Sequence, residues 1–175
     1  MSKPFENQYD PDLVTPPGET LAESIETLGM SQAELAERTG RSKKLINEII
    51  KGKAPITERM SIELERVLGV PASFWINRER HYREFLARKE EKERLAGQVD
   101  WLKKIPVNAM VRLGWIKRSR DKVEQLKEML RFFSIASPEQ WALLEQAYLG
   151  NVAFRRSSAF KSDTGALIAW LRQGE

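Results

Sequence analysis

Two adjacent lysines lie where a helix is expected to begin. Lys43 and Lys44 follow Ser42, a helix-capping residue type, in the stretch SQAELAERTGRSKKLINEIIKGK of residues 31–53. The helix dipole is positive at this end, so a cation there is disfavoured by about 0.3–1 kcal/mol. An external anion removes the conflict, because the lysines and the free backbone N–H groups then face the same negative charge. The pattern therefore predicts an anion-binding helix end, and an exposed lysine pair that only aids solubility is the alternative.

No group of residues in the sequence has the types and spacing of a catalytic centre. The chain has no cysteine, which excludes disulfides, thiolate zinc sites and cysteine nucleophiles. Its one histidine, His81, lies in the charged stretch NRERHYREF and is expected at the surface. A Walker loop, a Rossmann glycine fingerprint and a G-x-S-x-G elbow are also missing from the sequence. We expect no enzymatic activity, no metal site and no cofactor.

Charge is unevenly distributed along the chain of 175 residues, whose net charge is +4. The first 30 residues carry six carboxylates and one lysine, whereas residues 31–60 carry seven basic and four acidic side chains. The basic excess thus begins at the segment that contains the lysine pair. No apolar run approaches the roughly 18 residues of a membrane span. We expect a cytoplasmic protein without an export signal or a membrane segment.

Apolar residues recur at helical spacing in the first half of the chain. Leu21, Ile25 and Leu28 form the expected buried stripe of a first helix. Four further helices follow, each with a start signal of its own. The expected caps of the next three helices and the opening residue of the fifth are Ser31, Ser42, Thr57 and Pro71.

The second half is also predicted to be helical. The charged stretch RKEEKER after the fifth helix is interpreted as a solvated helical connector, with Gly97 as the hinge. Further on, Ser137 with Gln140 has the spacing of a capping box. Large aromatic side chains usually build cores, so four tryptophans are expected to be buried there. These are Trp101, Trp115, Trp141 and Trp170.

The expected fold is therefore all-α, with two domains. Residues 1–14 are expected to form an acidic N-terminal arm, and residues 15–96 a five-helix domain with the charged connector. Residues 97–175 are expected to form a smaller helical domain that serves dimerisation or partner binding.

The stretch SQAELAERTGRSKKLINEIIKGKAPIT resembles the lambda-repressor-like (XRE) helix-turn-helix. PPGETLAESIETLGMSQ before it and ITERMSIELERVLGVPASFWIN after it resemble the HigA-type antitoxin branch of that family, so that the likeness covers about residues 15–85. It implies a DNA-binding domain whose recognition helix enters the major groove. The residues expected to bind DNA are Ser31, Gln32, Arg41, Ser42, Lys43, Lys44, Asn47, Glu48, Lys51 and Lys53.

The resemblance also implies individual roles. It places Gln32 on a backbone phosphate and Asn47 near phosphates, together with Lys51 and Lys53. Lys43, Lys44 and Glu48 then face bases. Lysine can donate to guanine, and glutamate can accept from cytosine N4. Glu48 has an alternative, an ion pair with Lys44 four residues earlier.

The second half resembles the connector of longer regulators that carry an ImmA/IrrE-type zinc metallopeptidase, in VDWLKKIPVNAMVRLGWIKRS, FFSIASPEQW and AFKSDTGALIAWLRQGE.

Three alternative functions follow from these two resemblances. The first is an antitoxin of a HigBA-like type II system, a homodimer that represses its own inverted-repeat operator and neutralises a RelE-like toxin. The second is a stand-alone regulator that senses a ligand or partner through a tryptophan-lined pocket. The third is the regulatory part of a longer metallopeptidase regulator.

Overall fold

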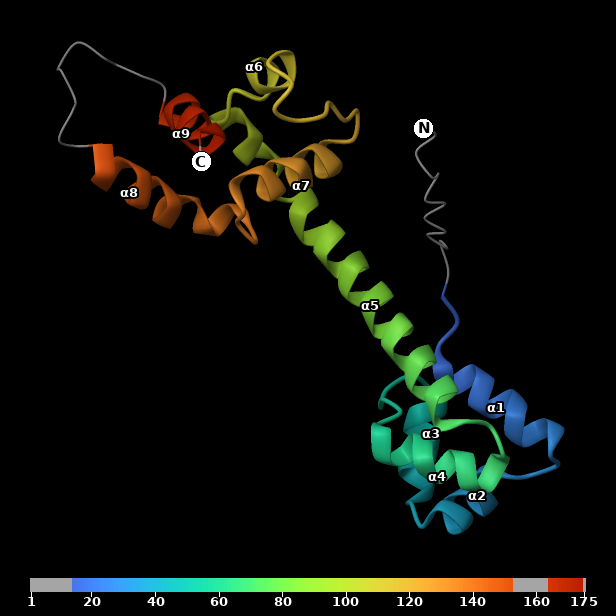
Figure 1. The fold of residues 1–175 in the computed structure, drawn as a ribbon. Helices are drawn as coiled ribbons and strands as arrows, with labels where there is room; N and C mark the ends of the chain where they lie inside the picture. The colour runs from blue at the N-terminus through green and yellow to red at the C-terminus, as the bar shows by residue number, and fades with distance from the viewer. Residues whose placement is uncertain (1–13, 153–163, 175) are drawn as a thin grey trace, which may run out of the picture. The chain divides into compact units, whose positions relative to one another are not determined.

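Every regular element in the described part of the chain is helical, which confirms the all-α prediction. The computed structural model describes residues 14–152 and 164–174, with backbone only for residues 149–152. Most of the predicted acidic arm, residues 1–13, lies outside these ranges. The chain divides into two compact units, residues 1–89 and 90–175. In chain order the elements of Figure 1 are α1 (Pro17–Thr27), α2 (Gln32–Thr39), α3 (Lys43–Ile50), α4 (Glu58–Leu68), α5 (Ala72–Ala96), the 3-10 helix η1 (Val99–Lys104), α6 (Val107–Arg112), α7 (Lys122–Phe133), the 3-10 helix η2 (Pro138–Gln140), α8 (Trp141–Val152) and α9 (Thr164–Gln173).

The first unit packs α1 to α4 and the beginning of α5 around a mainly aliphatic core. The predicted caps Ser31, Ser42 and Thr57 are confirmed. Each side chain accepts a hydrogen bond from the backbone N–H three residues later, at 3.1 to 3.2 Å. These caps fix where α2, α3 and α4 begin. The buried apolar residues are Leu21, Ile25, Met30, Leu35, Ala36, Ile46, Ile49, Ile56, Met60, Leu64 and Trp75.

One residue of the predicted α1 stripe does not belong to this core. Leu28 is 55% exposed, because α1 ends at Thr27 and the chain then turns at Gly29, whose φ is +63°. The turn is closed by a hydrogen bond of 2.8 Å from the Met30 N–H to the Ile25 carbonyl. Met30 therefore takes the buried place that the spacing assigned to Leu28.

Helix α5 supplies residues to both units. Trp75, near its start, is fully buried in the first core, and residues 87–94 are exposed, as expected for a charged connector. Leu95, however, is fully buried in the second core. The division between the units consequently falls inside α5, before the predicted hinge at Gly97.

The second unit has an aromatic centre. Trp101, Phe133 and Trp141 pack edge to face, with ring centroids 5.0 to 6.3 Å apart. Such pairs add to the burial of large apolar surfaces. The buried apolar residues of this unit are Leu95, Trp101, Ile105, Met110, Ile116, Val123, Leu126, Met129, Leu130, Phe133, Trp141, Ile168 and Ala169.

Two predictions for this half are wrong. Trp170 is 65% exposed, because α9 buries Gly165, Ile168 and Ala169 instead. Ser137 does not cap a helix through its side chain; its hydroxyl contacts the side chains of Glu139 and Gln140.

None of the helices in the described ranges combines the length and apolar composition that crossing a membrane requires.

Candidate nucleic-acid interface

Helices α2 and α3 are joined by a tight turn that is set by its own residues. Gly40 ends α2 in the left-handed conformation, with φ at +65° and ψ at +27°. Only a residue without Cβ adopts this conformation at little cost. Ser42 then starts α3 two residues later. The turn therefore follows the helix-turn-helix pattern that was predicted from Gly40 and the two serine caps.

The C-terminus of α3 is held against the beginning of α1. A Cβ atom added to Gly18 would lie 2.1 Å from the carbonyl oxygen of Ile49 and 2.5 Å from that of Ile50. These two backbones can approach so closely only because residue 18 is glycine. Ile46 and Ile49 are buried on the same side of α3, so its position in the unit is fixed at several points.

The opposite side of α3 carries the lysine pair. Lys43 and Lys44 are the first two residues of the helix, and both are exposed. The Lys44 Nζ lies 3.8 Å from Oε1 of Glu48, and 82% of the Lys44 side chain is exposed. Glu48 thus lies within reach of the ion pair that was its alternative role. An exposed pair at this distance holds a lysine only weakly.

Gln32 and Asn47 connect the two helices of the motif. The Asn47 Nδ2 donates to Oε1 of Gln32 at 3.2 Å, and both side chains are partly buried. This bond uses the amide oxygen of Gln32 and leaves its NH₂ group as a donor. A donor at the start of α2 is suited to a phosphate oxygen. Lys51 and Lys53 are exposed after α3, on either side of Gly52.

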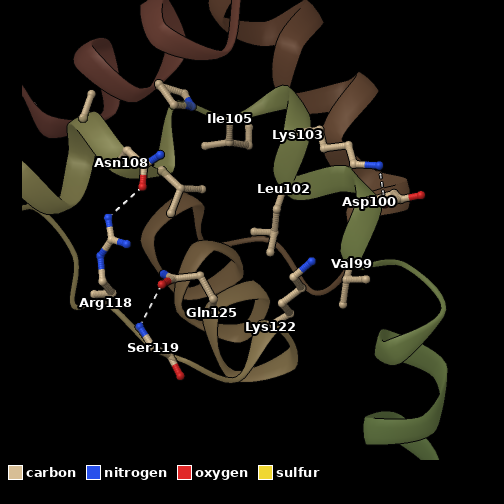
Figure 2. A pocket seen from close by; sticks show the side chains of 13 residues that line it. Val99, Asp100, Leu102, Lys103, Ile105, Asn108, Arg118, Ser119, Lys122 and Gln125 are labelled. Atoms are coloured by element: carbon tan, nitrogen blue, oxygen red, sulfur yellow. Dashed lines mark hydrogen bonds and ion pairs between the residues drawn. The ribbon is translucent and has the colours of Figure 1, made fainter.

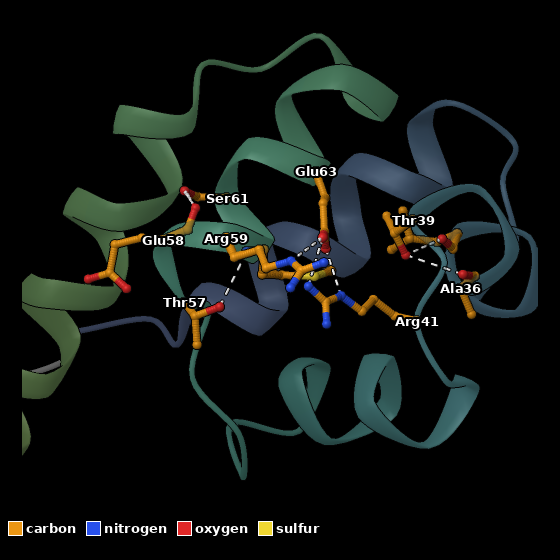
Figure 3. A network of polar contacts seen from close by, with 10 residues as sticks. Ala36, Thr39, Arg41, Thr57, Glu58, Arg59, Ser61 and Glu63 are labelled. Atoms are coloured by element: carbon orange, nitrogen blue, oxygen red, sulfur yellow. Dashed lines mark hydrogen bonds and ion pairs between the residues drawn. The ribbon is translucent and has the colours of Figure 1, made fainter.

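Arg41, one of the predicted DNA-binding residues, is bound within the first unit by Glu63. Its Nε and Nη2 each donate to a different carboxylate oxygen of Glu63, both at 2.7 Å. Arg59 Nε lies 3.3 Å from Oε1 of the same carboxylate. Figure 3 shows both arginines pointing toward Glu63. These bonds, that of Arg41 above all, hold the pKa of Glu63 below its ordinary value. The pair therefore fastens the turn before α3 to α4.

Two polar residues of α5, Glu79 and Arg78, also position the motif, and no sequence pattern predicted either role. Oε2 of Glu79 accepts a hydrogen bond of 3.1 Å from the backbone N–H of Ile56, and the glutamate is only 7% exposed. Arg83 donates to its other oxygen at 2.6 Å. Arg78 Nη2 donates to the Thr20 hydroxyl at 2.7 Å. Since these contacts join residues 23 and 58 positions apart, no local spacing could have predicted them.

His81 is exposed, and its Nε2 lies 3.3 Å from Nη2 of Arg80. In the described ranges, no three residues of the types His, Asp and Glu are grouped as metal ligands would be. The structure accordingly brings the predicted residues of α2 and α3 together, while His81 lies on α5 within a charged stretch.

Residues 21–75 match the sequence family described as Helix-turn-helix, a span that extends from α1 into α5. The chain therefore contains a helix-turn-helix domain. Over 61 residues it is 31% identical to the uncharacterized HTH-type transcriptional regulator YddM of Escherichia coli (strain K12). The matched segment is 35% of this chain and 65% of that relative, so this chain spans just under two thirds of the relative's length.

Two solved structures are also similar. An addiction module antidote protein of a HigA family from Coxiella burnetii is 27% identical, covering 48% of this chain and 92% of that chain, with a TM-score of 0.44. The Pseudomonas aeruginosa antitoxin HigA, solved with the higBA promoter, is 28% identical, covering 47% of this chain and 90% of that one, with a TM-score of 0.45. The family match ends before the segments that resemble a metallopeptidase connector, and that likeness remains a prediction.

Proposed function

We propose that this chain is a sequence-specific DNA-binding repressor of transcription that acts in the cytoplasm, by binding rather than by catalysis. The observation that carries the proposal is the exposed lysine pair at the start of α3, directly after the Ser42 cap. A neutral cap with two cations leaves an uncompensated positive helix end, and DNA phosphates and guanine acceptors compensate it. The family match to residues 21–75 and the HTH-type regulator among the relatives support this proposal.

Each residue of the interface has a proposed role. Gln32 donates to a phosphate from the start of α2, and its bond to Asn47 holds it in place. Lys43 and Lys44 enter the major groove, where Glu48 either reads cytosine or orients Lys44. Ser31 and Ser42 lie at the starts of the two helices. Arg41 bonds Glu63 through Nε and Nη2, so its Nη1 can donate to a phosphate. Lys51 and Lys53 neutralise phosphates.

The finer proposal is an antitoxin, which rests on the sequence resemblance of residues 15–85. As a homodimer it occupies an inverted repeat and represses its own promoter, and it also neutralises a RelE-like toxin.

The stand-alone regulator is the second candidate function. A pocket in the second unit favours it, although no tryptophan lines that pocket. Affinity capture of the tagged chain from its native cells separates the two: a small basic protein that is recovered in stoichiometric amount favours the antitoxin.

In vitro selection from a random duplex library tests the DNA-binding proposal. We expect an inverted repeat with half-sites about 10 bp apart, one helical turn. The selected duplex is then titrated beside a scrambled duplex at fixed salt, where specific binding is typically tighter by about 10³-fold or more. His81→Ala and a metal chelator serve as controls that leave binding unchanged. Equal affinity for both duplexes would exclude sequence-specific recognition.

A further inference from the structure

The second unit contains an open pocket that the DNA-binding proposal does not use. Its volume is about 660 Å³, and it lies among η1, α6, the segment before α7, and α7 itself. Figure 2 shows the thirteen side chains that line it. Its wall combines apolar residues of η1 and α6 with three cations and one carboxylate, a net charge of +2. The lining therefore has an apolar part and a positive part.

Arg118 is an exposed residue whose backbone and side chain are both restrained at this pocket. Gln125, only 6% exposed, accepts a hydrogen bond of 2.8 Å from the Ser119 N–H and donates one of 3.2 Å to the Lys117 carbonyl. The backbone is thus fastened on both sides of Arg118. Nη2 of Arg118 also donates to Oδ1 of Asn108 at 2.7 Å. A neutral amide leaves the guanidinium charge uncompensated, and a cation that is already restrained loses less entropy on binding an anion.

The other charged residues of the lining are an exposed ion pair of Lys103 with Asp100 and a further exposed lysine, Lys122, whose charge also acts on Asp100. Lys103 Nζ lies 2.7 Å from Oδ1 of Asp100, and this pair lowers the pKa of Asp100, so the carboxylate stays ionised beside its lysine. Lys122 is exposed at the start of α7, and Figure 2 shows it and Arg118 on opposite sides of Gln125. Arg118 and Lys122 therefore supply the net positive charge of the pocket.

The apolar part of the lining lies beside these cations. Leu102 and Val107 are partly buried and pack against the second core, and Ile105 is a buried member of that core. An inorganic anion would leave this surface in contact with water, whereas an apolar chain attached to the anion covers it. A concave site with apolar walls and a few fixed polar groups is the usual form of a small-molecule site.

We propose that this pocket binds a small organic anion, a carboxylate attached to an apolar chain or ring. The carboxylate lies at Arg118, where Lys122 on the other side of Gln125 adds to the positive charge of the lining, and the apolar body lies on Leu102, Ile105 and Val107. The inference depends only on the second unit and holds whether or not the chain binds DNA. It assigns a ligand class to the half of the chain for which the family match gives no function.

The test is calorimetric titration of the full chain with three probes. Octanoate carries both the carboxylate and the apolar chain, octanamide lacks the charge, and acetate lacks the chain. We expect saturable binding of octanoate with a Kd near or below ~1 mM, and much weaker binding of the other two probes. Equal binding of octanamide, or no saturation by octanoate at roughly 10 mM, would overturn the proposal.

Two charge-removing variants and one matched control locate the site. Arg118→Gln and Lys122→Gln are each expected to raise the Kd of octanoate about threefold to tenfold, the effect of a partly exposed charge pair. Lys104→Gln removes a lysine of η1 that does not line the pocket, and we expect an unchanged Kd. Thermal unfolding shows whether each variant is folded. If Arg118→Gln disturbs the unit, Lys122→Gln still tests the site, because Lys122 is exposed. Octanoate binding that is unchanged in both variants would place the ligand elsewhere and contradict the assignment.

Discussion

A lysine follows the N-cap in both α3 and α7, but the two helix starts differ in how that charge is compensated. Lys43 follows Ser42, a neutral cap. Lys122 follows Asp121, whose Oδ1 accepts from the Val123 N–H at 2.7 Å and whose carboxylate offsets the positive helix end. The excess charge of α3 is therefore open to an external anion at an exposed helix, whereas the second unit presents Arg118, whose hydrogen-bond partner is a neutral amide, in a pocket. The first arrangement suits a long polyanion and the second a small one.

Separating the two units is expected to have the largest effect on operator affinity. A fragment of residues 1–89 keeps Trp75 and the whole first core, and we expect it to unfold cooperatively. If the second unit provides dimerisation, the fragment keeps salt-dependent, nonspecific DNA binding but loses roughly 10²- to 10⁴-fold in operator affinity. The measurement is a titration of fragment and full chain on one operator, beside their sedimentation masses. A dimeric fragment that binds as tightly as the full chain would assign dimerisation to the first unit.

Gly18→Ala is expected to destabilise the first unit only. The new Cβ would lie 2.1 Å from the Ile49 carbonyl oxygen, so α1 or α3 must shift, and overpacking of this kind costs about 1–3 kcal/mol. Gly97→Ala is the matched control, because its Cβ would meet its nearest atom, the carbonyl oxygen of Arg94, at 3.4 Å. Chemical denaturation measures both variants. We expect weaker DNA binding and unchanged octanoate binding in Gly18→Ala; a free energy of unfolding like that of the control would contradict the observed packing.

Lys44→Ala is expected to separate base contacts from phosphate contacts. If Lys44 reads a base, operator binding weakens by roughly 1–3 kcal/mol and specificity relaxes at one position. Gln32→Ala, which removes a phosphate contact, weakens binding to all sequences alike. Both variants are titrated on operator and scrambled duplexes, and neither is expected to change octanoate binding. Equal losses on both duplexes would make Lys44 a phosphate contact.

The sequence predicted the local features of the first unit well because they depend on near neighbours. A serine cap bonds the N–H three residues later, and a glycine ends a helix through its own φ, so Ser42 and Gly40 could be interpreted directly. The pair of Arg41 with Glu63 and the bond from Ile56 to Glu79 join residues more than 20 positions apart. Their partners depend on the packed fold, which helical periodicity does not specify.

The second unit was predicted less well for a related reason. Trp170 was expected in the core on grounds of residue type, but burial depends on which side of α9 faces its neighbours, and α9 buries small residues with Ile168. Likewise, the spacing of Ser137 and Gln140 matched a capping box, yet a 3-10 helix forms there and the hydroxyl contacts side chains. Which side of a helix is buried depends on how the helices pack in the folded unit, and the sequence pattern does not specify that packing.

Glu63→Gln is expected to lower the stability of the first unit in a pH-dependent way. The pKa of Glu63 is below its ordinary value of 4.5 in the folded chain, first because Arg41 donates to it. A lowered pKa means that the carboxylate stabilises the fold fully above its unfolded pKa and that this stability is lost as pH falls through the folded pKa. Thermal unfolding of both proteins between pH 3 and 7 should give a difference that is constant near neutrality and shrinks in acid. A difference independent of pH would indicate that the ion pair contributes nothing.

The smallest expected effect concerns the salt dependence of DNA binding. Lys51 and Lys53 are exposed after α3, and each that neutralises one phosphate releases about one counterion. Lys51→Ala or Lys53→Ala should therefore lower the slope of log K against log salt by about one, and the double variant by about two. Lys103→Ala and Lys104→Ala remove lysines of the second unit that are also exposed, and we expect the slope to stay unchanged. A similar decrease with Lys103→Ala or Lys104→Ala would show that DNA also contacts the second unit, because counterion release requires a phosphate at the lysine concerned. The contrast between a polyanion surface at α3 and a small-anion pocket near α7 would then no longer hold.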